Sequence, residues 1–99
     1  MSDDKYSKFD GQYAVIPSIT QYALTRYVTE GQDGGDFITA VLENNLQQAF
    51  AHADLDNVEA MDAIVKWIYN RAPGSCWGDR EKVRAWYTHH GMKGLECQL

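Results

Sequence analysis

The chain has 99 residues and a formal net charge of −5, and 44% of its residues are hydrophobic. A chain of this length can bury one hydrophobic core but not two, and its apolar content is too high for a disordered chain. It has no run of about 18 apolar residues that could span a membrane, and it begins without the apolar stretch of a secretory signal. Two cysteines are too few for a disulfide framework. We therefore expect a single cytoplasmic domain.

The net charge hides an uneven distribution along the chain. Residues 27–65 contain eight acidic residues and no Lys or Arg, whereas residues 66–93 contain six basic residues against two acidic ones. The overall negative charge opposes a phosphate backbone, so we expect no direct DNA binding. The acidic stretch is either a solvated face, the commoner case, or a surface for a basic site on another protein. The candidate partner-binding residues of this acidic face are Glu43, Asp54, Asp56, Glu59 and Asp62.

Polar segments without periodicity set the expected boundaries of the domain. Residues 1–12 are predicted to be a flexible N-terminal arm, residues 13–91 a single helical domain, and residues 92–99 a loosely attached tail. The apolar run at 13–16 has no strand-like segment to pair with, so we expect an extended lead-in packed on the core.

Apolar residues at helical spacing predict a first helix over residues 18–30. Ser18 and Gln21 have the spacing of a capping box, and Gly31 is suited to end the helix. The expected apolar face consists of Ile19, Tyr22, Ala23, Tyr27 and Val28.

Two longer helices are predicted next, over residues 36–53 and 58–72. Acidic and Asn residues at 54–57 can cap the second of them, and Pro73 ends it, because the residue before proline avoids the helical region. Since a short turn joins the two helices, we expect a central antiparallel αα-hairpin. The apolar stripes are Phe37, Ile38, Val41, Leu42, Leu46, Ala49, Phe50 and Ala53, followed by Val58, Met61, Ile64, Val65, Ile68 and Ala72.

The last predicted helix covers residues 79–90. It follows a loop bounded by Gly and Pro at 73–78, it is capped by Asp79, and Gly91 is suited to end it. The whole pattern predicts an all-α fold, a small bundle of about four helices.

No sequence motif of a known catalytic class is present, so we expect a protein that is not an enzyme and needs no cofactor. Cys76, His89, His90 and Cys97 lie in the last quarter of the chain. They lack the closely spaced ligand pairs of structural zinc sites, so no metal site is expected. A Cys76 nucleophile activated by either histidine is the alternative, but nothing in the sequence lowers the thiol pKa.

The loop around Trp77 is the most informative segment for ligand binding. Arginines beside an aromatic face and a helix start suit an anion attached to a flat ring, such as a nucleotide. The alternative is that Trp77 plugs the end of the bundle, which is commoner for a large aromatic side chain. The candidate ligand-binding residues are Tyr69, Asn70, Arg71, Cys76, Trp77, Arg80 and Arg84.

Aromatic residues near the N-terminus suggest self-association. A small bundle has little room to bury them all, and an exposed aromatic patch usually marks an interface, so we expect a homo-oligomer. The residues concerned are Tyr6, Phe9, Tyr13, Tyr22 and Tyr27.

Several short motifs, taken in order, resemble a group of small, uncharacterised phage and prophage proteins. They are Ile16-Pro17, Gly35-Asp36-Phe37-Ile38, Ala40-Val41-Leu42, Asn44-Asn45-Leu46, Ala53-Asp54, Asn57, Ile68-Tyr69-Asn70, Ala72-Pro73 and Cys76-Trp77-Gly78. The resemblance brings no catalytic residue with it. It implies a phage accessory protein in the host cytoplasm that binds and inhibits a host protein, for example an anti-phage defence component. The alternative is a sponge that sequesters a signalling nucleotide near Trp77.

Overall fold

The computed structural model describes the backbone of residues 6–98 and the side chains of residues 6–94. Within this part of the chain the fold is all-α, as predicted, with seven α-helices rather than about four and with no strand. The α-helices are α1 (Ser18–Glu30), α2 (Asp36–Leu42), α3 (Leu46–His52), α4 (Leu55–Glu59), α5 (Met61–Arg71), α6 (Arg80–Thr88) and α7 (Gly91–Gln98). Two short 3₁₀ helices, η2 (Gly11–Val15) and η3 (Gly74–Cys76), lie before α1 and after α5.

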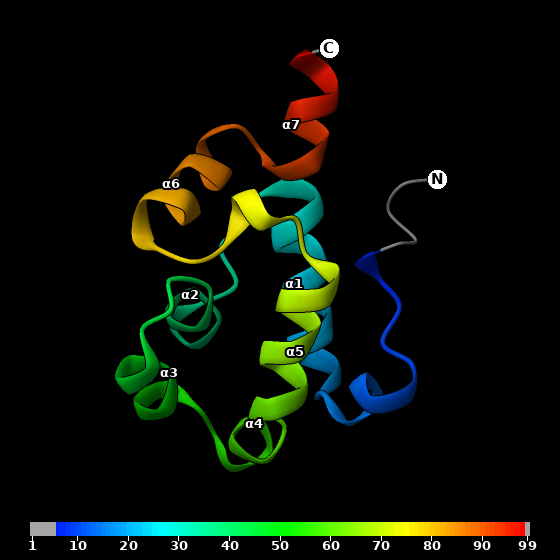
Figure 1. The fold of residues 1–99 in the computed structure, drawn as a ribbon, viewed down its shortest axis with the longest axis vertical. Coiled ribbons are helices and arrows are strands. Elements are labelled where there is room, and N and C mark those ends of the chain that lie inside the picture. Colours follow the sequence, from blue (N-terminus) through cyan, green and yellow to red (C-terminus); the bar gives the residue numbers. More distant parts are fainter. Residues whose placement is uncertain (1–5, 99) are drawn as a thin grey trace.

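Helices α1 and α5 form the middle of the molecule (Figure 1). The N-terminal segment lies on one side of them, and α2, α3 and α6 lie on the other. Helix α4 sits at the lower end of α5, and α7 continues beyond the upper end of α1. No helix among the described residues is both long and apolar enough to cross a membrane.

The described part of the predicted N-terminal arm packs on the helices. Tyr6 is buried, and its backbone carbonyl accepts a 2.6 Å hydrogen bond from the Thr25 hydroxyl of α1. Phe9 stacks on Trp67 of α5 with 4.9 Å between ring centroids. Residues 13–15 of the expected extended lead-in belong to the 3₁₀ helix η2, and only Ile16 is extended. Tyr13 and Ile16 are buried, as expected of a segment packed on the core. Residues 1–5 of the predicted arm lie outside the described residues.

This packing buries most of the aromatic side chains that suggested self-association. Tyr6, Tyr13 and Tyr27 are buried, and Phe9 is half-buried against Trp67; only Tyr22 among the five is exposed. The homo-oligomer therefore stays a prediction, and fewer exposed aromatic side chains support it than the sequence suggests.

Helix α1 has the predicted bounds, but its buried face differs from the predicted one. Ile19 is 85% exposed and Tyr22 is also exposed, whereas Thr20 and Leu24 are buried. Burial of Thr20 is tolerated because its hydroxyl donates a 2.7 Å hydrogen bond to the side-chain oxygen of Asn57. The expected capping box is absent, since the helix begins after Pro17 without a side-chain cap.

The predicted helix at 36–53 is divided in two by a pair of asparagines. Asn44 has a positive φ of 64°, and the N–H of Asn45 donates to the carbonyl of Ala40, which is the bond pattern of a Schellman motif. The Asn45 side chain then caps α3 by accepting from the Gln48 N–H. Because the chain reverses here, α2 and α3 pack against each other as a hairpin.

The predicted helix at 58–72 is also divided, and it starts earlier. Asp54 caps α4, as expected of a turn rich in capping residues, and Ala60 separates α4 from α5. Helix α5 ends at Arg71, and Ala72 is extended before Pro73, as predicted. The expected hairpin of two long helices is therefore wrong in its location, because the hairpin lies within residues 36–53 instead.

Asp79 caps α6 as predicted, but Gly91 does not end the helical part of the chain. His90 adopts a positive φ of 65°, and Gly91 begins the additional helix α7 over part of the predicted tail. Gly31 at the end of α1 and Gly91 lie so close that a Cβ on Gly91 would be 2.5 Å from the Gly31 nitrogen. Two glycines thus allow the end of α1 to contact the start of α7.

Candidate binding groove

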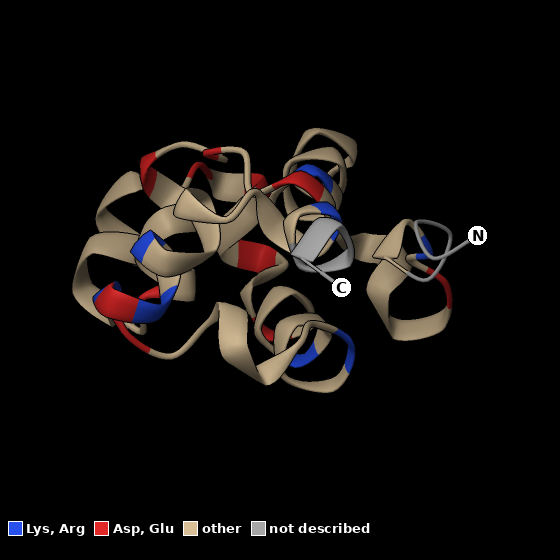
Figure 2. Ribbon diagram, turned by 90° about the horizontal axis from the view of Figure 1, so that it is seen from above, with Lys and Arg blue, Asp and Glu red and all other residues tan. Residues whose placement is uncertain are grey.

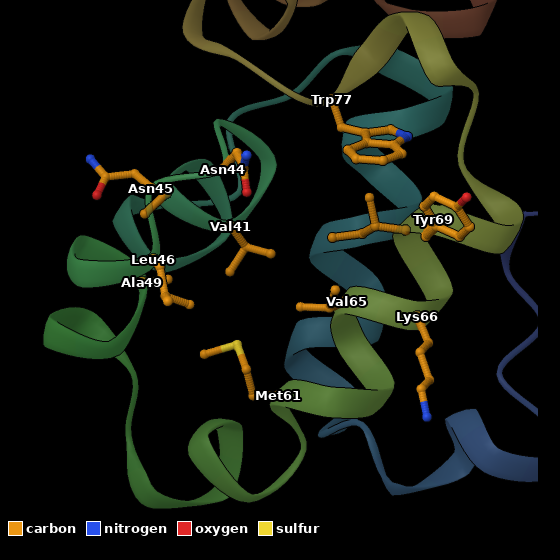
Figure 3. A pocket seen from close by; sticks show the side chains of 12 residues that line it. Val41, Asn44, Asn45, Leu46, Ala49, Met61, Val65, Lys66, Tyr69 and Trp77 are labelled. Atoms are coloured by element: carbon orange, nitrogen blue, oxygen red, sulfur yellow. The ribbon is translucent and has the colours of Figure 1, made fainter.

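A groove opens between the α2–α3 hairpin and α5, with Trp77 above it (Figure 3). Its volume is about 230 Å³ and its lining is mostly apolar. The lining residues are Ala40, Val41, Asn44, Asn45, Leu46, Ala49, Met61, Val65, Lys66, Ile68, Tyr69 and Trp77. We call this site the groove below.

The α2–α3 wall is shaped by the turn at Asn44 and Asn45. Because the chain reverses there, Val41 at the end of α2 and Leu46 at the start of α3 both line the groove (Figure 3). Leu46 is 66% exposed, although its spacing in the sequence matches a core position. The apolar stripe predicted from the sequence therefore includes exposed residues that line the groove as well as core residues.

The opposite wall is one face of α5. Met61, Val65 and Tyr69 are spaced four residues apart, so they lie one above another on the helix and all line the groove. Val65 is 47% and Tyr69 72% exposed, whereas Met61 is buried at the lower end. Lys66 also lines the groove and pairs with Asp62 at 3.2 Å.

Trp77 is held in place by the backbone on both sides of it. The carbonyl of Cys76 accepts a 2.7 Å hydrogen bond from the Tyr27 hydroxyl, and the N–H of Gly78 donates at 2.8 Å to the carbonyl of Leu42. The indole is half-buried and makes an edge contact with the Tyr69 ring at 5.8 Å. Trp77 is thus a fixed side chain at the rim of the groove and not a fully buried plug.

The Trp77 side chain carries one unsatisfied polar group. Its buried Nε1 has no hydrogen-bond partner among the described residues. An unpaired buried donor lowers stability by about 1–3 kcal/mol relative to a paired one. The indole N–H of Trp77 at the rim of the groove therefore lacks the hydrogen-bond partner that the indole N–H of Trp86 has in the core.

The structure brings together only part of the predicted ligand site. Tyr69 and Trp77 share the groove, but Arg71 pairs with Asp10 at 3.5 Å and lies over the Tyr13 ring. Asn70 donates to the Tyr13 hydroxyl on the same side of α5. Arg80 and Arg84 are exposed on α6 and do not line the groove, so the three arginines do not converge on Trp77.

Cys76 is fully buried under the loop, and burial raises the pKa of its thiol to about 12. Very little thiolate exists at neutral pH with such a pKa, which argues against Cys76 as a nucleophile. His89 contacts the ring of Trp86 instead, with 4.8 Å between centroids. Among the residues that the structure describes, no three His, Cys, Asp or Glu side chains are close enough to hold a metal; the Cys97 side chain lies outside them.

The predicted acidic face divides into two parts. Glu43 lies near Tyr27 and Tyr87, where its charge contributes to raising the pKa of both hydroxyls, after the larger effect of burial. The other four carboxylates are exposed: Asp54 is the N-cap of α4, Asp56 and Glu59 belong to α4, and Asp62 lies in the first turn of α5. Figure 2 shows acidic residues on several elements rather than on one continuous face.

Sequence reasoning did not identify the groove as such. The sequence predicts Leu46, Met61 and Val65 in core stripes, and it predicts one continuous helix through Asn44 and Asn45. The useful signal was the pair of adjacent asparagines, because Asn tolerates a positive φ and caps helices.

No family model, no curated protein and no solved structure matches this chain.

Proposed function

We propose that this protein acts by binding another protein, whose apolar side chains enter the groove. One observation carries the proposal: Leu46, Val65 and Tyr69 leave large apolar surfaces exposed around a preformed hollow. Exposed apolar residues that cluster in this way usually mark an interaction site. The aromatic pair of Trp77 and Tyr69 supplies the kind of residue that dominates binding energy at interfaces.

The size of the groove favours a protein partner over a drug-sized ligand. Small-molecule sites usually measure about 300–1,000 Å³. A volume of about 230 Å³ is below that range and suits a few side chains of a larger partner. The mostly apolar lining agrees with this, since it offers few groups to orient a polar ligand.

The resemblance to small phage proteins supplies the proposed context. A phage accessory protein of this kind acts in the host cytoplasm by inhibiting a host protein, such as an anti-phage defence component. Binding without catalysis is sufficient for this role, because an inhibitor needs only to occupy a functional surface of its target.

A pair of matched variants tests the proposal. Wild-type protein, Leu46→Glu and Ile19→Glu are each used to capture proteins from a host lysate, and the captured protein is then purified for calorimetric titration. Leu46 lines the groove, whereas Ile19 is on α1, more exposed and outside the groove lining. We expect Leu46→Glu to bind at least tenfold more weakly, because it places a charge in an apolar contact.

The control variant Ile19→Glu should bind like wild type. Both substitutions are at exposed positions, so we expect each to change the free energy of unfolding by less than about 0.5 kcal/mol. Equal binding by Leu46→Glu and wild type would contradict the groove as the site.

The nucleotide alternative stays a prediction. A nucleotide needs cations for its phosphate groups, and Lys66 is the one cationic side chain among the described residues that line the groove. We expect no thermal stabilisation by millimolar cyclic or linear nucleotides. A clear rise in melting temperature would favour the nucleotide function instead, because a ligand that binds the native state stabilises it by mass action.

A further inference from the structure

Four exposed carboxylates lie on α4, at its N-cap and in the first turn of α5, near the residue that closes the lower end of the groove. Met61 closes this end, and α4 lies directly below it (Figure 3). Asp54, Asp56, Glu59 and Asp62 are all exposed and lie within seven residues of Met61 in the sequence. Lys66 pairs with Asp62, and no other Lys or Arg occurs between residues 43 and 66. The segment around the lower end of the apolar groove therefore carries an excess of exposed negative charge.

Building on the proposed function, we propose that the groove binds an amphipathic helix whose apolar face enters it and whose Lys or Arg residues lie over α4. Charge complementarity between the basic residues of the partner helix and the four carboxylates determines in which direction the helix lies in the groove, and it increases the rate of association. The four carboxylates around α4 and the Trp77 region, considered separately in the sequence, then act as two parts of one binding surface.

The dimensions of the groove set the length of the helix. Met61 and Tyr69 are eight residues apart on α5, which corresponds to about 12 Å, or a little over two helical turns. A partner helix of this length presents apolar residues at positions i, i+3 or i+4, and i+7, the spacing of helix-in-groove recognition. An extended peptide fits less well, because the described residues include no strand whose edge could pair with it.

A second copy of this chain is a poorer occupant. In a symmetric dimer the same surface patch meets itself, so both copies would bring their α4 carboxylates to the interface. Like charges placed opposite each other at an interface are unfavourable. With a net charge of −5 the chain also repels its own copies as a whole.

A random library of 16-residue peptides, displayed on a carrier and selected against the full chain, tests the inference. The selected peptides are assayed at low and high salt against wild type, Val65→Glu, the double variant Asp56→Asn with Glu59→Gln, and Ile19→Glu. We expect enriched peptides with apolar residues at helical spacing and a net positive charge. Their affinity should fall at least tenfold for Val65→Glu, severalfold for the double variant and at high salt, and not at all for Ile19→Glu.

The outcomes separate the two proposals. Peptides that require Val65 but carry no net positive charge, or that bind the double variant as tightly as wild type, would overturn the basic helix and leave the groove as the site. Peptides that bind Val65→Glu as well as wild type would overturn both proposals, whereas the absence of any enriched peptide would overturn the basic helix alone. A dimer in light scattering that Val65→Glu dissociates would show that a second copy occupies the groove, and would overturn the basic helix as well.

Discussion

Trp86 and Trp77 are nine residues apart in the sequence and have opposite surroundings. Trp86 is 1% exposed, and its Nε1 donates a 2.8 Å hydrogen bond to the carbonyl of Tyr27. Trp77 is half-buried at the rim of the groove, and its Nε1 lacks a partner among the described residues. We call the packing around Trp86, Tyr27, Gly31 and Gly91 the closed region. The difference indicates that the closed region stabilises the fold, while the groove leaves apolar surface exposed.

Substitution of each tryptophan by alanine tests this comparison with the largest expected effect. Trp86→Ala should lower the free energy of unfolding by about 3–5 kcal/mol through the cavity alone, and further because the carbonyl of Tyr27 loses one of its two donors and keeps only the Gly31 N–H. Trp77→Ala should lower it much less, since part of the ring is already in solvent. Urea unfolding of both variants measures the difference.

The phenylalanine variants isolate the role of the indole N–H. Trp86→Phe removes a hydrogen bond, whereas Trp77→Phe removes a buried donor without a partner in the described structure. Trp77→Phe should therefore be nearly neutral for stability, while Trp86→Phe remains destabilising by about 1–3 kcal/mol or more. Equal losses for the two variants would contradict the division into a closed region and an open groove.

Alkaline pH should weaken the packing that supports Trp77. Burial raises the pKa of the Cys76 thiol from 9.0 to about 12, so the protonated thiol is the form that the fold favours. The stability that it contributes is complete below pH 9 and is lost as the pH rises toward 12. The loss is about 1.4 kcal/mol by pH 10 and about 4 kcal/mol beyond pH 12. Urea unfolding between pH 7.5 and 10 measures it.

The variant Cys76→Ala serves as the control for this pH dependence. It removes the titrating thiol, so its stability should change little between pH 7.5 and 10. Burial also raises the pKa of Tyr27, so the tyrosine hydroxyl adds to the loss only at higher pH. A wild-type protein whose stability stayed constant up to pH 10 would contradict the burial of the thiol.

A substitution at the contact between Gly31 and Gly91 should lower the free energy of unfolding by a smaller amount. Both residues have positive φ, and a Cβ on either would lie less than 3 Å from backbone atoms of the other. Gly91→Ala should lower stability by about 2–3 kcal/mol, through left-handed strain together with the clash. Gly74→Ala is the matched control, because its Cβ would meet no atom within 4 Å and its φ is not positive.

Local signals in the sequence predicted local features of the fold well. The bounds of α1, the cap at Asp79 and the end of α5 before Pro73 depend on neighbouring residues only, and all three are confirmed. Asp54 also caps a helix, but that helix is α4, which begins within the predicted turn. Helix α7 was missed because Gly91 and Gly94 resemble the end of a helix. Its first turn is placed by contact with α1, which is far away in the sequence.

The candidate site was only partly predictable for a similar reason. Helical spacing identifies residues that share a face, and Leu46 and Val65 do share faces with core residues. Spacing does not show whether the neighbouring helix covers that face. Here the turn at Asn44 and Asn45 moves α3 away from α5, so these side chains line an open groove.

Loss of the helix cap at Asn45, in the wall of the groove, should have the smallest effect on the free energy of unfolding. Asn45→Ala removes the hydrogen bond to the Gln48 N–H and should lower stability by about 1 kcal/mol. Asn44→Gly should be nearly neutral, because glycine adopts a positive φ without strain. Denaturant unfolding compares the two, and equal losses would contradict the capping role.

Tyr27 connects the closed region to the groove through two different atoms. Its carbonyl accepts from Trp86, and its hydroxyl donates to the carbonyl of Cys76 next to Trp77. One residue of α1 thus connects α6 with the Trp77 loop. If an occupant of the groove displaces the loop, the hydrogen bond between the Tyr27 hydroxyl and the Cys76 carbonyl is strained, because Tyr27 itself is fixed in the core. Amide hydrogen exchange in α6 should therefore respond when the groove is filled, although α6 itself does not line it.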